Sequence, residues 1–143
     1  MRRWLHTLTV SVSALLAGGC PTVELGEEPV APGSCRPDED YYREVIWPEY
    51  LAPDDPDRSC VGQAGCHRDS DGRSALRLVA AEPLSDADHR SNYEVVTSFL
   101  SCGAPDRSAL LTKPEEGQNA HEGGELFAPG SEPYELFLDW FES

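Results

Sequence analysis

The chain has 143 residues, a mass of 15.7 kDa and 26 acidic against 11 basic residues, which gives a formal net charge of −15. This length predicts one domain. The acidic balance argues against nucleic-acid binding, because a protein that neutralises phosphates needs a basic face. A mean hydropathy of −0.46 excludes a bundle of membrane helices.

The first 19 residues have the pattern of a secretory signal peptide. Arg2 and Arg3 form a positive head, and the apolar stretch that follows is too short and too interrupted by Thr and Ser for a spanning helix. Small residues then lead into a cysteine, in the order Leu15-Leu16-Ala17-Gly18-Gly19-Cys20. The alternative is an ordinary cleaved signal peptide followed by a chance cysteine.

The segment that ends at Cys20 resembles the lipobox of bacterial lipoproteins. The resemblance implies that Cys20 becomes an acylated first residue, anchored to a membrane surface that faces the periplasm or the outside. Pro21, the next residue, favours the outer membrane. Cleavage removes two basic residues and no acidic ones, so the processed chain carries 26 acidic against nine basic residues, a net charge of −17.

Residues 20–37 are rich in Pro, Gly and Glu and have no apolar repeat, so they predict a solvated tether. The folded domain is predicted to span residues 38–143. Its first helix begins at a cap formed by Asp38 or Asp40, and Pro48 limits or kinks it. Apolar side chains recur there at helical spacing: Tyr42, Val45, Ile46 and Tyr50.

The middle of the chain predicts shorter elements. Residues 75–81 form a strand or an irregular buried segment, and a helix is expected from about Asn92 to Cys102. Pro114 ends a short element at Leu110 and Leu111. Residues 115–130, which hold four glycines, are predicted to form a loop.

A helix is also predicted at the C-terminus, with Ser131 as its cap and Pro133 in its first turn. One helix face carries Tyr134, Phe137, Leu138 and Phe141, widened by Leu136 and Trp140. The predicted fold class is therefore mainly α, with long loops.

The chemistry-bearing motif is Cys60-Val-Gly-Gln-Ala-Gly-Cys66-His67. Two cysteines with a histidine directly after the second are the arrangement that attaches haem c, because the thiols add to the two vinyl groups and the histidine ligates the iron. The usual motif has two residues between the cysteines, whereas five stand here.

The order of several motifs resembles a family of secreted cytochrome-c-like domains, abundant in planctomycetes and myxobacteria and often found in lipoproteins. The resemblance covers about residues 38–143 and rests on Val45-Ile46-Trp47-Pro48, the Cys60…Cys66-His67 motif, residues 108–114, His121-Glu122-Gly123-Gly124, and the aromatic terminal helix. It implies that the first and last helices cross, and that one haem c, which transfers single electrons, lies between loops.

In this resemblance Cys60 and Cys66 are the thioether sites and His67 is the proximal ligand. Many relatives supply a distal Met, but the processed chain has none, so His121 becomes the sixth ligand and a lower potential is implied. If haem takes Cys60 and Cys66, Cys35 and Cys102 remain to pair. The acidic charge predicts a redox partner with a basic docking face.

Other interpretations of these residues stay open. Cys60 and Cys66 could form a short disulfide in a haem-free binding or structural module on the cell surface, and without haem four cysteines allow three pairings. A zinc site formed by Cys60, Cys66, His67 and Cys102 is a further alternative. No catalytic triad, phosphate loop or carboxylate pair stands out, so no enzyme is inferred.

Overall fold

A computed structural model describes residues 33–55, 57–62, 66–70, 72, 74–117, 121 and 123–143. This part of the chain is mainly helical and contains no strand, only two isolated bridges, so the mainly α fold class is confirmed. The elements in order are α1 (Glu39–Tyr41), the π-helix η1 (Tyr42–Leu51), α2 (Asp86–Thr97), the 3-10 turn η2 (Pro105–Arg107), α3 (Ala109–Thr112) and α4 (Glu132–Phe141).

The first helix runs without interruption from α1 into η1. Asp38 caps it, since its Oδ1 accepts a hydrogen bond of 2.6 Å from the backbone N–H of Tyr41. Pro48 lies inside η1, which continues three residues beyond it to Leu51. The wider π-type bonding, in which Ala52 N–H donates to the Trp47 carbonyl over 2.7 Å, accommodates the proline without ending the helix.

Helix α2 differs from the expected bounds of Asn92 to Cys102, because it begins at Asp86 and ends at Thr97. A capping box fixes its start. The Ser85 hydroxyl accepts from Asp88 N–H over 3.2 Å, and the Asp88 carboxylate accepts from Ser85 N–H over 3.1 Å. The first two turns are polar, so the apolar pattern alone placed the start too late.

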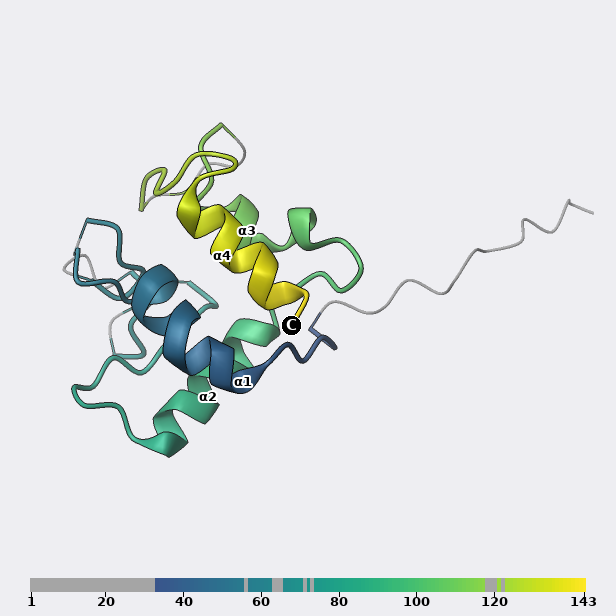
Figure 1. Cartoon of the computed structure of the whole chain (residues 1–143). Coiled ribbons are helices and arrows are strands. Elements are labelled where there is room, and N and C mark those ends of the chain that lie inside the picture. The colour runs from purple at the N-terminus through teal and green to yellow at the C-terminus, as the bar shows by residue number, and fades with distance from the viewer. Residues whose placement is uncertain are drawn as a thin grey trace, which may run out of the picture.

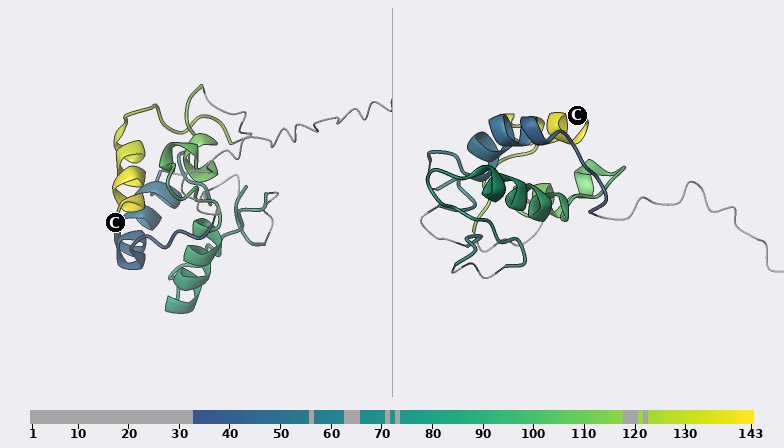
Figure 2. Two further views of the ribbon diagram at one scale, coloured as in Figure 1. Left: turned by 90° about the vertical axis from the view of Figure 1, so that its right-hand side faces the viewer. Right: turned by 90° about the horizontal axis from the view of Figure 1, so that it is seen from below.

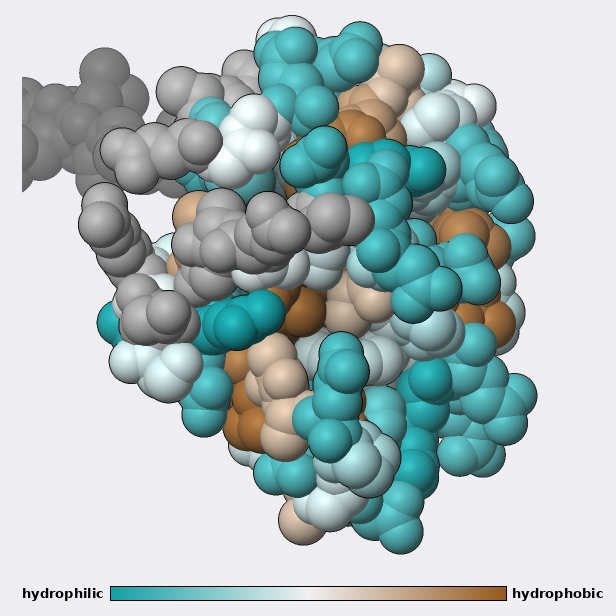
Figure 3. Space-filling view, turned by 90° about the vertical axis from the view of Figure 1, so that its left-hand side faces the viewer, coloured by the Kyte–Doolittle hydropathy of each residue, from teal (hydrophilic) through white to brown (hydrophobic). Residues whose placement is uncertain are grey.

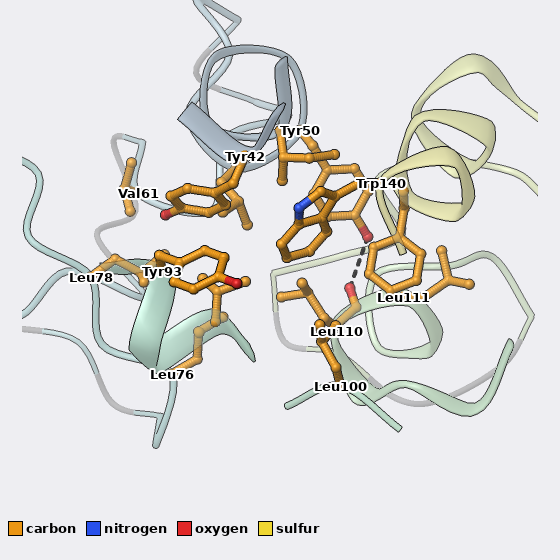
Figure 4. Close-up of a cluster of buried hydrophobic side chains, with 14 of the residues drawn as sticks. Tyr42, Tyr50, Val61, Leu76, Leu78, Tyr93, Leu100, Leu110, Leu111 and Trp140 are labelled. Carbon is orange, nitrogen blue, oxygen red and sulfur yellow. Dashed lines mark hydrogen bonds between the residues drawn. The ribbon is translucent and has the colours of Figure 1, made fainter. Parts of the chain in front are cut away.

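The core lies between η1, α2 and α4. Helix α4 packs beside η1, and α2 lies beneath them (Figures 1 and 2). Figure 4 shows Tyr42, Tyr50 and Trp140 facing leucines from α3 and from the segments around α2. On α4 the fully buried residues are Phe137 and Trp140, so Trp140 lies at the centre of the apolar face and not at its edge.

Three aromatic side chains donate a hydrogen bond from their polar group to a backbone carbonyl. These bonds offset the free energy of burying a polar group together with a large ring. Tyr50 donates to Leu110 over 2.8 Å (Figure 4). Trp140 donates to Asp38 over 3.0 Å, and Tyr93 donates to Pro37 over 2.6 Å. The last two bonds join the C-terminal helix and α2 to the start of the domain.

The described residues before Asp38 also contact the domain. A disulfide joins Cys35 to Cys102, with the Cα atoms 5.4 Å apart, and Gly33 N–H donates to the Leu100 carbonyl over 2.9 Å. The signal peptide, Cys20 and most of the predicted tether lie outside the described residues. Within the part of the chain that is described, no helix is long and apolar enough to cross a membrane.

The remaining segments are irregular where they are described. The stretch 75–81 forms one parallel bridge, in which Leu78 pairs with Arg68, and it is otherwise without regular structure. Helix α3 covers the predicted short element before Pro114. In the loop that follows, Glu115 pairs with Phe127, which holds the two ends of the loop together.

Candidate functional site

His67 and His121, separated by 54 positions in the chain, face one another. Their ring centroids lie 5.9 Å apart and the ring planes are inclined by 16°. These are the two residues that the family resemblance implies as axial ligands. Loops bring them together, since neither residue lies in a helix.

Backbone bonds fix the chain at each ring. The Leu78 N–H donates to the His67 carbonyl over 2.7 Å, and Asp69 N–H donates to the Leu78 carbonyl over 2.9 Å. On the other side, Gly124 N–H donates to the His121 carbonyl over 2.9 Å, which closes a tight turn. Each histidine is therefore held by its own turn or bridge.

Both rings use Nδ1 for a hydrogen bond to a carbonyl oxygen. Nδ1 of His67 lies 3.0 Å from the Leu76 oxygen and 2.7 Å from the Ser74 hydroxyl, which itself donates to Leu76. Nδ1 of His121 lies 2.9 Å from the Gly124 oxygen. A carbonyl oxygen only accepts, so Nδ1 of each ring carries a proton and Nε2 is the nitrogen left for another partner. This is the tautomer that metal-ligating histidines adopt.

Electrostatics favours the same form of His67. Burial lowers the pKa of its imidazole, and the nearby His121 lowers it further, while the bond to Leu76 opposes both effects. The net direction is downward, so the ring is neutral at pH 7. A neutral imidazole is the form that binds a metal.

Gly123 leaves space for the ring of His121. A Cβ atom built at Gly123 would lie 2.8 Å from Cε1 of His121 and 3.3 Å from Nδ1, closer than carbon atoms pack. Any larger residue there would displace the ring. Sequence reasoning noted the His-Glu-Gly-Gly order but not this steric role.

Cys60 and Cys66 retain their thiols in the structure. Cys60 packs against the core, and its N–H donates to the Leu51 carbonyl over 2.9 Å, which ties it to the end of η1. Burial raises the pKa of the Cys60 thiol to about 12, so it is protonated at pH 7. Cys66 precedes His67 directly, and residues 63–65 between the cysteines lie outside the described residues.

The disulfide between Cys35 and Cys102 removes one of the zinc ligands considered from the sequence. The expectation that Cys102 joins Cys60, Cys66 and His67 around zinc is therefore wrong in this structure. Among the described residues, no group of three or more His, Cys, Asp or Glu side chains is placed to hold a metal ion.

The residues present fit haem better than a bare metal ion. Tetrahedral zinc needs at least three protein ligands, whereas haem iron takes its equatorial ligands from the porphyrin and one or two axial ligands from the protein. The histidine pair offers two, and Cys60 and Cys66 retain their thiols. The Tyr42 hydroxyl is buried, has no partner among the described residues and points toward Val61, which follows Cys60 (Figure 4).

Sequence reasoning did not find the groups that orient the histidines. Ser74 and the Leu76 carbonyl contact His67 only because the chain turns back after Gly72, whose N–H donates to the Arg68 carbonyl over 2.8 Å. Every residue has a backbone carbonyl, so the sequence does not indicate which carbonyl will bond to a histidine. The predicted lipidation site, Cys20, lies outside the described residues.

Comparisons with protein-family models, with curated protein sequences and with solved structures found no match to this chain.

Proposed function

We propose that this protein is a membrane-anchored, c-type cytochrome-like lipoprotein that binds one haem and transfers single electrons. The observation that supports it most is the pair of facing histidines, His67 and His121, each with Nδ1 on a backbone carbonyl. A histidine whose Nδ1 bonds a carbonyl keeps Nε2 for a metal, so these two neighbouring rings could supply two ligands to one iron.

The chain's own residues have separate parts in this proposal. Cys60 and Cys66 would hold the haem through thioether bonds, and His67 and His121 would ligate its iron. When bound, the haem supplies a one-electron ferric–ferrous couple. Ser74 positions His67, since its hydroxyl lies between Nδ1 and the Leu76 carbonyl.

The proposed partner is a redox protein with a basic face. The processed chain has 26 acidic against nine basic residues, so a complementary face would be steered toward it electrostatically. The proposed location is the periplasmic or cell-surface side of a membrane, with the lipid on Cys20 as the anchor. The lipobox-like segment before Cys20 supports this location.

The experiment is expression in a periplasm that contains haem-c maturation machinery, followed by intact mass and a pyridine haemochrome spectrum. We expect a red protein whose mass includes one haem and whose spectrum shows a low-spin iron. The His121→Ala variant should keep the covalent haem and lose the low-spin spectrum, because one axial ligand is gone. His89→Ala is the matched control, since His89 is the remaining histidine of the processed chain and should leave the spectrum unchanged.

A colourless wild-type protein without the mass of haem, made under conditions that mature a known c-type cytochrome, would contradict the proposal. The second candidate would then stand: a haem-free, disulfide-stabilised binding or structural module. The atypical five-residue spacing of Cys60 and Cys66 favours that candidate. A mass lower by two hydrogens than that of the protein with one disulfide would indicate that these two cysteines pair.

A further inference from the structure

One arginine side chain joins the two segments that carry Cys60 and Cys66. Nε of Arg68 donates a hydrogen bond of 2.8 Å to the backbone carbonyl of Val61. Val61 directly follows Cys60, and Arg68 comes two positions after Cys66. The bond therefore closes a ring that contains most of the stretch between the two cysteines.

The backbone at each end of this bond is anchored to the domain. The side chain of Val61 is buried, and the N–H of Cys60 before it donates to the Leu51 carbonyl at the end of η1. At the other end, Arg68 forms a backbone bridge with Leu78, which is fully buried. A side chain that bonds two anchored segments restricts the separation between them, whereas a loop without such a bond samples many separations.

Gly72 keeps the segment around Arg68 compact. Its N–H donates to the Arg68 carbonyl over 2.8 Å. A Cβ atom built at Gly72 would overlap that oxygen and would lie 2.9 Å from the carbonyl oxygen of Cys66. Because no side chain fits there without a shift of the backbone, the tight turn that sets the path of the chain from Cys66 to Gly72 requires glycine.

The side chain of Arg68 is exposed. The loops between η1 and α2 lie on the side of the molecule seen in Figure 3, where hydrophilic side chains flank patches of hydrophobic surface. A charged donor makes a stronger hydrogen bond than a neutral one, so the bond to Val61 contributes even at the surface. Substitution of an exposed side chain should leave the buried core intact.

We propose that Arg68 is a positioning residue for the two cysteines, because its bond to Val61 draws their segments together and offsets the long spacing between them. Both candidate functions need the two thiols to be close. Haem attachment places them at one edge of the porphyrin, and a disulfide joins them directly. The proposal therefore stands independently of haem attachment.

The test is the equilibrium between the two thiols and their disulfide in the full processed chain, made without haem and held in a glutathione buffer. The protein thiols are oxidised, and one glutathione disulfide is reduced to two thiols, which take the two protons. A tryptic peptide that begins at Ser59 contains both cysteines, so its mass after free thiols are blocked reports the bridge. The equilibrium is measured and not the rate, since burial raises the pKa of the Cys60 thiol to about 12 and slows its reaction.

Two variants of Arg68 separate its hydrogen bond from its charge. Methionine matches the arginine stem in length but has no donor at the position of Nε, so in Arg68→Met the effective concentration of one thiol toward the other should fall about five-fold. Glutamine carries an uncharged N–H donor at that position, so Arg68→Gln should stay within about two-fold of the wild type. Rescue by an uncharged donor is not expected if Arg68 acts through its charge.

Arg77→Met is the matched control. Arg77 is also exposed and donates to the Asp69 carbonyl over 3.2 Å, but this bond does not span the two cysteines. The variant loses the same charge and should keep the wild-type value. An unchanged value in Arg68→Met, equal losses in Arg68→Met and Arg68→Gln, or an equal loss in Arg77→Met would each overturn the proposal. Thiols that fail to pair in the wild-type protein at every glutathione ratio would overturn it as well, because they would not be close.

Discussion

Each of the two facing histidines has a backbone carbonyl oxygen within hydrogen-bond distance of Nδ1. This contact determines which ring nitrogen remains available to a ligand. Nδ1–H of His67 points at Leu76 and Nδ1–H of His121 points at Gly124, over 3.0 and 2.9 Å. Both bonds would break if the rings flipped, so they fix the orientation of each ring. Nε2 is therefore the nitrogen of each ring that is available to a metal.

The position of His121 depends on Gly123, which gives a prediction at the residue scale. In Gly123→Ala the new Cβ atom would lie 2.8 Å from Cε1 of His121, so the ring must move. Gly123 is exposed, and its backbone is outside the left-handed region, so the unfolding free energy should stay within about 1 kcal/mol of the wild type. We expect the haem-loaded variant to lose its low-spin spectrum, as recorded by absorption.

The control is Gly117→Ala in the same loop. Its φ is +75° and a Cβ atom there would meet no atom within 4 Å, so the substitution strains the backbone by about 1 kcal/mol without touching His121. This variant should be less stable and should keep the spectrum. If Gly123→Ala also keeps it, the ring does not depend on that glycine.

The roles of single residues were only partly accessible from the sequence. The two histidines were paired through the order of motifs around them, and the structure brings their rings together. The sequence did not predict the contacts of the histidines with Ser74 and with the carbonyls of Leu76 and Gly124. Backbone carbonyls are the same at every residue. Whether they meet a side chain depends on where the chain turns.

At the scale of elements, patterns that repeat along a helix were more informative than those at its ends. The terminal helix was expected from Ser131 and the aromatic spacing, and α4 covers Glu132–Phe141. Ser131 occupies the cap position, but its hydroxyl makes no capping bond among the described residues, so that part of the expectation is wrong. Helix α2 was placed several residues late, because its first turns, Asp86 to Arg90, are polar. Its start depends on a side-chain cap at Ser85, where Asp88 replaces the more usual Glu or Gln.

The first helix was expected near its observed start but not in its observed form. Asp38 caps it as one of the two expected residues. The π-type bonding of η1 around Pro48 was not predicted, because a proline in a helical pattern signals an end or a kink equally well. Packing of η1 against α4 favours the continued helix, since Tyr50 and Leu51, which follow the proline, are both buried.

The disulfide between Cys35 and Cys102 joins the segment before α1 to the loop after α2, which gives a prediction at this scale. It spans 67 positions of the chain. Since closing such a loop restricts the unfolded state, the Cys35→Ser/Cys102→Ser variant should lose roughly 4 kcal/mol of unfolding free energy. Urea unfolding followed by circular dichroism measures this change.

Reduction of the wild-type protein should lower the urea midpoint to that of the double variant. Cys60→Ser is the control in the haem-free protein and should respond to reductant as the wild type does, because Cys60 forms no disulfide. An unfolding midpoint that does not change on removal of Cys35 and Cys102 would show that the bridge adds no stability.

At the scale of the whole molecule, the acidic excess acts against folding. The processed chain carries 26 acidic and nine basic residues, so like charges are brought closer together when it becomes compact. The ion pairs of the described residues do little to offset this. Arg43–Asp86, Arg90–Glu39 and Arg36–Glu94 all have at least one exposed partner, and such pairs contribute about 0.2–1 kcal/mol each.

Salt should therefore stabilise this protein. The screening length falls from about 30 Å at 0.01 M salt to about 8 Å at 0.15 M, so repulsion across the domain is weakened more than the ion pairs at contact distance. At pH 7 we expect the thermal midpoint to rise by about 5 °C between 10 and 300 mM NaCl, which corresponds to about 1 kcal/mol for a domain of this size. Near pH 4.4, the isoelectric point of the sequence, the same change in salt should have little effect because the net charge is close to zero.

Potassium chloride is the control and should act as sodium chloride does, since screening depends on ionic strength and not on the cation. A midpoint that falls as salt is added at pH 7 would mean that attractive pairs outweigh the repulsion among the acidic residues.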